Sequence, residues 1–344
     1  MTTRKRSWWP VWVGLGLLAA LAVLLFLRAK APPEAARLLP ESDAIVFANL
    51  RPLRSLAHWD ELSTATADVH RSRDFQAFID ATGIVPERDL DSVAFALHRM
   101  PDPRGPNGAV AYSEVLIGRF DAGRLRRYLT SLSRGSETYA GREIYSIPVE
   151  GRTLRVAIVA YDTVAASNAP SSEQIHSILD RSRASALWQP GSSLLAARFS
   201  AVPLLSQVWG IGRIGLPFGQ GGRIAVMGFE LPVPVDTELI ASVRYSGSVH
   251  LRVEEIAPDA LAAQHTAESV SNILSLVRGL AGAEGPRNPR DAAMRAVLSS
   301  ARVGQRDHRA ILTASASLDE ARLLATGTPP PDEAEVGSAA REEK

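Results

Sequence analysis

A long uncharged stretch near the N-terminus sets the first limit on how this chain can be organised. It runs from Trp8 to Leu27, 20 residues without an acidic or basic side chain. At 1.5 Å per residue, a helix of this length extends about 30 Å, which matches the hydrocarbon core of a bilayer. A helix in a soluble core is rarely apolar on every face over so many turns. The stretch therefore predicts a transmembrane helix.

Tryptophans gather at the first end of this stretch, where indole rings favour the lipid headgroup region. The side chains predicted to contact the bilayer are Trp8, Trp9, Trp12, Leu17, Leu18, Leu21, Leu24, Leu25, Phe26 and Leu27. A cleaved secretory signal is the alternative, because Ala29-Lys30-Ala31 is a small-x-small triplet. However, Pro32 follows the triplet directly, and the apolar run exceeds the roughly 7–15 residues of such signals. We therefore expect an uncleaved signal anchor.

The charges that flank the stretch predict its orientation. The basic cluster Arg4-Lys5-Arg6 precedes it, and Arg28 and Lys30 follow it. The flank with more basic residues tends to stay in the cytoplasm. The N-terminus is thus predicted to be cytoplasmic and the body extracytoplasmic, in the periplasm or at the cell surface.

Composition excludes several functions for that body. The 38 Lys+Arg residues nearly cancel the 37 Asp+Glu residues, so the basic excess of a nucleic-acid binder is missing and no nucleic-acid partner is expected. Cysteine is absent, which excludes disulfides, thiolate metal sites and a cysteine nucleophile. Lysine occurs only at Lys5, Lys30 and Lys344, so the body has no lysine for a Schiff base or a P-loop.

Helical and strand patterns alternate along the body and predict an α+β fold with mostly antiparallel strands. Predicted strands include 44–48, 92–98, 110–120, 143–148, 154–160, 223–230, 238–245, 250–256 and 308–314, while predicted helices include 58–82, 121–132, 258–279, 291–300 and 318–324. Turn residues at Gly151 and at Ser246-Gly247-Ser248 join neighbouring strands as hairpins.

The body also shows a weak internal echo. Residues 39–45 (LPESDAI) resemble residues 189–195 (QPGSSLL), and Pro52-Leu53 resembles Pro203-Leu204. The echo suggests two related sheet-plus-helix halves. The predicted organisation is a cytoplasmic stub and anchor at 1–30, a linker at 31–37, a first half at 38–187, a second half at 188–325 and a disordered tail at 326–344.

The anchor, the opening segment LPESDAIVFANL at 39–50 and the order of elements carry a family resemblance. The chain resembles a family of bacterial envelope proteins of unknown function. The resemblance implies a single N-terminal span followed by a repeated α+β extracytoplasmic region. It implies no catalytic residue.

One motif needs a separate test for cofactor chemistry. Residues 210–215 (GIGRIG) fit the G-x-G-x-x-G pattern, which binds a pyrophosphate only where it joins a strand to a helix. Here a helix-like segment at 202–209 precedes it, and Leu216-Pro217 prevents a helix after it. The prediction is a glycine loop without a cofactor.

That loop is unusually apolar, which leaves burial, contact with the membrane surface or a lip for a ligand or partner as alternatives. The residues of this candidate lip are Trp209, Ile211, Ile214, Leu216 and Phe218. The seven histidines show no metal-ligand spacing, so no catalytic, cofactor or metal residue is predicted.

Three function hypotheses remain from the sequence. The leading one is a membrane-anchored extracytoplasmic interaction or scaffolding protein without catalytic activity. The second is a small-molecule or lipid-binding module with a cleft between the halves. The third is an unrecognised hydrolase, which requires a histidine and a carboxylate within hydrogen-bond reach in a cleft. The expected partners are the bilayer, through residues 8–27, and an unidentified envelope protein or ligand.

Overall fold

The computed structural model of the chain describes residues 31–54, 73–105, 108–149, 151–184, 191–213, 223–226, 229–232, 237–283, 285–286 and 288–325. The predicted anchor at 1–30 and the predicted tail at 326–344 lie outside these residues. Within the described ranges, no helix combines the length and the apolar character needed to cross a bilayer.

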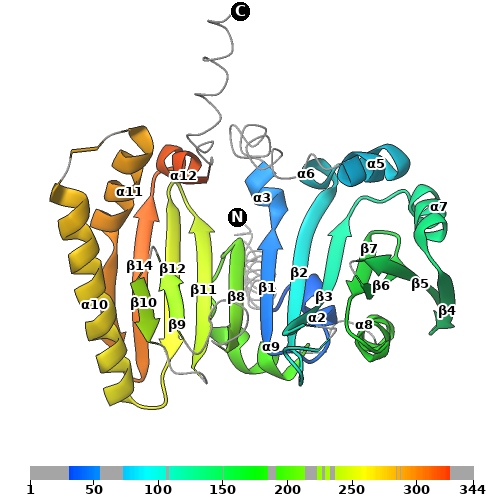
Figure 1. The fold of residues 1–344 in the computed structure, drawn as a ribbon, viewed down its shortest axis with the longest axis horizontal. Helices are drawn as coiled ribbons and strands as arrows, with labels where there is room; N and C mark the ends of the chain where they lie inside the picture. The colour runs from blue at the N-terminus through cyan, green and yellow to red at the C-terminus, as the bar shows by residue number, and fades with distance from the viewer. Residues whose placement is uncertain are drawn as a thin grey trace, which may run out of the picture.

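The body is an α+β fold built on a 12-stranded sheet in which all the described pairings are antiparallel (Figure 1). The order across the sheet is β13-β14-β12-β11-β8-β1-β2-β3-β7-β6-β5-β4. Its strands are β1 (Ala44–Asn49), β2 (Leu90–Arg99), β3 (Val110–Gly118), β4 (Gly135–Tyr139), β5 (Arg142–Val149), β6 (Arg152–Ala160), β7 (Thr163–Ser167), β8 (Val208–Arg213), β11 (Glu238–Tyr245), β12 (Val249–Ile256), β13 (Arg302–Arg306) and β14 (Arg309–Ala316). The helices are α2 (Glu34–Leu38), α3 (Leu50–Arg54), α5 (Arg73–Thr82), α6 (Pro86–Asp89), α7 (Ala122–Leu132), α8 (Glu173–Arg183), α9 (Ser193–Arg198), η1 (Phe199–Ala201), α10 (Ala260–Ala283), α11 (Pro289–Ser300) and α12 (Leu318–Ala325).

The order of the first five strands is similar on the two sides of the β1–β8 pair. Outward from the β1–β8 pair, one side reads β1-β2-β3-β7-β6-β5-β4 and the other reads β8-β11-β12-β14-β13, so β5 and β4 have no counterpart. Strands β1 and β8 pair with each other, with Phe47 opposite Trp209. The sequence echo is nevertheless misaligned, because its offset of about 150 residues matches strand β1 with helix α9. The duplication itself stays a hypothesis.

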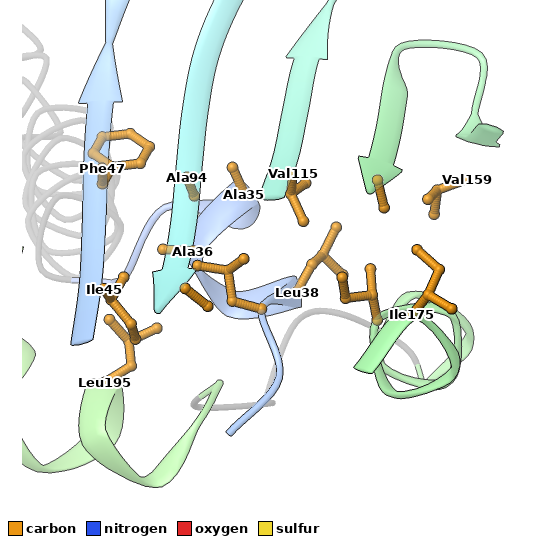
Figure 2. Close-up of a cluster of buried hydrophobic side chains, with 14 of the residues drawn as sticks. Ala35, Ala36, Leu38, Ile45, Phe47, Ala94, Val115, Val159, Ile175 and Leu195 are labelled. Atoms are coloured by element: carbon orange, nitrogen blue, oxygen red, sulfur yellow. The ribbon is translucent and has the colours of Figure 1, made fainter. Parts of the chain in front are cut away.

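Helices α2, α8 and α9 contribute to the main hydrophobic core on one face of the sheet. Figure 2 shows α2 between the strands and α8, with Ala35 and Ala36 beside the sheet residue Ala94. Both α2 alanines are fully buried. The predicted linker at 31–37 is therefore wrong over much of its length, because small alanine side chains let this short helix pack closely on the sheet.

Helix α7 covers the opposite face, since neighbouring residues on a strand point to opposite sides of a sheet. On β6, Ala157 belongs to the main core while Val156 packs with Leu125 and Leu129 of α7. The carboxylate of Asp121 accepts hydrogen bonds from the first-turn backbone N–H groups of α7. The helix predicted over 121–132 is thus confirmed, with its expected cap.

Several other local predictions need correction. The predicted strand 223–230 is instead a separate two-stranded hairpin of β9 (Arg223–Val226) and β10 (Phe229–Pro232). The helix-like segment predicted over 202–209 is not a helix, and β8 begins at Val208. Part of the helix predicted over 58–82 lies outside the described residues, and its remainder forms α5.

Candidate functional site

A groove of about 830 Å³ lies on the sheet face that carries the main core, in the second half of the chain and across the β1–β8 junction. Its apolar wall is built around Trp209, whose side chain is only 2% exposed. The Trp209 ring stacks on Phe47 of β1 and meets Phe199 of η1 edge-on, with ring centroids 5.4 Å apart in both pairs. The groove is therefore lined by aromatic residues from both predicted halves.

The rim of the groove carries two exposed leucines after η1. Leu204 is 43% exposed and Leu205 is 75% exposed. The Ser206 hydroxyl donates a hydrogen bond to the Pro203 carbonyl at 2.7 Å, which closes the turn that presents them. Leu205 has φ = 63°, a left-handed conformation that is unfavourable for a branched side chain. A strained, exposed apolar residue at a groove mouth is more typical of a contact site than of a structural turn.

The opposite wall is polar and comes from β11, β12 and β14. In the antiparallel register Arg244 faces His250 and Ser242 faces Arg252, so these side chains lie in two adjacent rows. At the base, Glu254 is buried at 3% exposure. Its carboxylate accepts from Arg252 Nε at 2.5 Å and from Arg309 Nη1 at 3.0 Å. The groove thus has an apolar side and a charged side.

The N-terminal end of the described chain enters beside the same groove. Ala31 and Pro33, which precede α2, both line it. Only residues 28–30 separate Ala31 from the end of the predicted transmembrane stretch at Leu27. The first described residue of the chain, Ala31, therefore lies at the groove.

The G-x-G-x-x-G segment has a structural explanation. Gly210 and Gly212 lie within strand β8, not in the predicted loop. Gly212 faces Ala44 of β1, and a Cβ at position 212 would lie 2.4 Å from the Ala44 Cβ. The glycine permits close approach of the two central strands.

The predicted lip is only partly described. Trp209 and Ile211 are both buried on β8, which agrees with the burial alternative, and Trp209 also lines the groove. Ile214, Leu216 and Phe218 lie outside the described residues, as do all the predicted bilayer-contacting residues of the anchor.

Buried His98 belongs to a polar ladder between strands. Its Nε2 lies 2.9 Å from the Ser113 hydroxyl, which donates to the Ser167 hydroxyl at 3.0 Å. Burial lowers the pKa of His98 and favours the neutral ring. All three side chains are at most 8% exposed. The ladder therefore satisfies buried polar groups and presents no nucleophile to a substrate.

The histidine–carboxylate pair formed by His176 and Glu137 lies elsewhere. The His176 Nε2 is 3.0 Å from the Glu137 carboxylate, and its ring stacks on Tyr139 at 3.8 Å. Neither member of the pair lines the groove. Among the described residues, no three His, Asp or Glu side chains are grouped closely enough to hold a metal ion.

Sequence reasoning missed the polar wall and the leucine rim. The available signal was a two-residue alternation in a hairpin, with polar residues at 242, 244, 250, 252 and 254. Both strands lie inside the sheet, and a polar row on one face of an antiparallel sheet is typical of a face that is open to water. The leucine rim had no comparable signal, because its exposure depends on the turn after η1.

Comparisons with known proteins identify no family. No protein-family model and no curated protein sequence matches the chain. Among solved structures, crystal form IV of TP0453 is 13% identical, with a TM-score of 0.42, and covers 87% of this chain and 99% of that chain. Crystal form III of TP0453 is 12% identical, with a TM-score of 0.41, and covers 86% and 99%. Likeness at this level assigns neither a family nor a function.

Proposed function

We propose that the protein is a single-pass membrane protein whose extracytoplasmic body binds an amphiphile in the groove beside its anchor. The observation that carries this proposal is that Ala31 and Pro33, which closely follow the predicted anchor at 1–30, line the apolar groove. The volume of about 830 Å³ falls within the range of ordinary ligand sites, roughly 300–1,000 Å³.

Chain length supports a position close to the bilayer. Four Cα–Cα steps connect Leu27 to Ala31. Even when fully extended, they span no more than about 14 Å. If the anchor ends at Leu27, the groove lies within that distance of the membrane surface. A lipid could then pass between the bilayer and the groove without crossing open water.

The groove is also relevant to the predicted cleft between the two halves, because both halves contribute lining residues. Phe47 comes from the first predicted half, whereas Trp209 and the polar wall come from the second. This supports the lipid-binding hypothesis over a purely structural junction. A fully packed β1–β8 junction would leave no space for a ligand.

A photo-crosslinking experiment tests this proposal. The chain has no cysteine, so Leu205→Cys creates a unique site for a benzophenone label on the full-length protein in proteoliposomes. Tyr161→Cys is the matched control, since Tyr161 is 84% exposed and does not line the groove. After illumination, mass spectrometry is expected to find lipid adducts at position 205 and few at position 161. Equal adduct yields at both positions, or none at 205, would refute the proposal.

A scaffolding role is the second candidate, and helix α10 is the observation that favours it. Leu261, Leu276 and Leu280 are 63%, 52% and 60% exposed on this helix. Exposed leucines on a long helix are typical of a protein-binding face. Loss of a co-purifying envelope protein in Leu276→Asp/Leu280→Asp, with lipid crosslinking unchanged, would favour this role. An unchanged set of co-purifying proteins would count against it.

A further inference from the structure

We infer that the amphiphile held in the groove has an anionic headgroup, which the arginines of the polar wall bind. This inference rests on the proposed lipid-binding function and specifies its ligand. The evidence for an anionic headgroup is the charge of the β11–β12 wall. Binding of acyl chains to the apolar wall alone would not require charged residues there.

Arg252 is held in place for such a contact. Its Nε donates to Glu254 at 2.5 Å, and no described acceptor bonds its two terminal Nη groups. The Arg252 side chain is 40% exposed, so these donors are accessible from the groove. A guanidinium fixed through Nε still presents two N–H groups on its outer edge, which suit a phosphate or a carboxylate.

Glu254 does not cancel this positive charge. Its second carboxylate oxygen accepts from Arg309 at 3.0 Å, so two arginines share one buried carboxylate. A buried carboxylate paired in this way acts as a fixed support for both guanidinium groups. The group of Arg252, Arg309 and Glu254 therefore keeps a net charge of +1.

Arg244 adds a second cation at the outer end of the wall. It is exposed, it lines the groove, and it has no ion-pair partner among the described residues. Its cross-strand neighbour is His250, whose Nε2 lies 3.0 Å from the Ser248 hydroxyl. Two arginines, Arg244 and Arg252, therefore line the groove, and Arg309 supports Glu254 from outside it.

The apolar wall strengthens the interaction between these cations and an anion. Trp209, Phe199 and Phe47 exclude water from one side of the groove, and charges interact more strongly where the effective dielectric constant is lower. A ligand that satisfies both walls needs an acyl part along the aromatic residues and a negative group at the arginines. An anionic phospholipid has this combination. A zwitterionic lipid also carries a positive group, which would lie near the arginines of the same wall.

The test compares two spin-labelled lipids that have the same acyl chains. The full-length protein carries a fluorophore on Leu205→Cys and is reconstituted in zwitterionic vesicles. The vesicles contain a low fraction of one spin-labelled lipid, either the zwitterionic or the anionic tracer, and quenching of the fluorophore by each tracer is measured at the same fraction. Charge-assisted hydrogen bonds predict about a tenfold preference for the anionic tracer. The double substitution Arg244→Gln/Arg252→Gln is expected to remove most of that preference and to leave quenching by the zwitterionic tracer unchanged.

Two further variants separate headgroup binding from loss of structure or nonspecific charge. Arg244→Gln alone removes a guanidinium that forms no ion pair with the described residues, so it leaves the support around Glu254 intact and is expected to reduce the preference. Arg99→Gln removes an exposed arginine outside the groove and is expected to have no effect.

The outcomes distinguish this inference from the function on which it rests. Equal quenching by both tracers overturns the anionic headgroup and leaves lipid binding in place. A preference that survives the double substitution also overturns the inference. Absence of quenching by either tracer contradicts the proposed function itself.

Discussion

Glu114 provides a quantitative test of the sheet packing. It lies on β3 between Phe95 of β2 and Ala166 of β7, on the face opposite the groove. The side chain is partly buried. Burial raises the pKa of the Glu114 carboxyl from 4.5 to about 7. A buried carboxylate without a cation partner destabilises the folded state when it is ionised.

The size of this effect follows from the two pKa values. Each pKa unit corresponds to 1.36 kcal/mol, so the full difference amounts to about 3 kcal/mol. Because water reaches part of the side chain, we expect about 1–3 kcal/mol. The folded state binds more protons than the unfolded state between pH 4.5 and about 7. Glu114 therefore reduces stability progressively as the pH rises through this window, and its cost is greatest above pH 7.

Replacement of this carboxylate by an amide should remove the cost. Glu114→Gln is expected to raise the free energy of unfolding by about 1–3 kcal/mol at pH 8 and to change it little at pH 4. Urea titrations of the full-length protein in a mild detergent, followed by tryptophan fluorescence, measure both values. Glu268→Gln on the exposed side of α10 is the control, for which we expect no pH-dependent gain. A Glu114→Gln effect that is equal at both pH values would refute the reasoning.

Three further predictions concern the central strands and the topology. Gly212→Ala is expected to destabilise the protein by about 1–3 kcal/mol in urea titrations, because the new methyl overlaps a β1 side chain, whereas Gly304→Ala, with open space around it, is expected to be neutral. Trp209→Ala is expected to cost about 3–5 kcal/mol by the same measurement, and Trp209→Phe less, since it keeps an aromatic ring between its two neighbours. A membrane-impermeant maleimide is expected to label Tyr161→Cys in intact cells and to leave Thr2→Cys unlabelled, and the reverse pattern would exclude an extracytoplasmic body.

Local turn and capping signals made much of the α+β fold predictable. The hairpins at Gly151 and at residues 246–248 and the cap at Asp121 are encoded within a few residues, and the structure has all three. Strand β7 was missed because its sequence, TVAAS, is short and consists mostly of residues with small side chains. The pairing of β7 with β3 and β6 stabilises it, and neither partner is visible in a local window.

The groove was less predictable because its walls come from distant parts of the chain. Phe47, Phe199 and Trp209 meet only after β8 pairs with β1. The same explanation holds for Gly212 of β8, which is required by Ala44, a residue far away in the sequence. The sequence predicts a linker where the buried helix α2 lies, because two alanines indicate burial only when the sheet beneath them is known.

Spin-label accessibility measures the contact between the groove and the bilayer most directly. A nitroxide on Leu205→Cys in the reconstituted full-length protein collides with oxygen, which concentrates in lipid, and with a water-soluble nickel chelate. We expect a higher ratio of oxygen to nickel collisions at position 205 than for the same label on Tyr161→Cys. Equal ratios at the two positions would show that the groove mouth lies in water, away from the membrane.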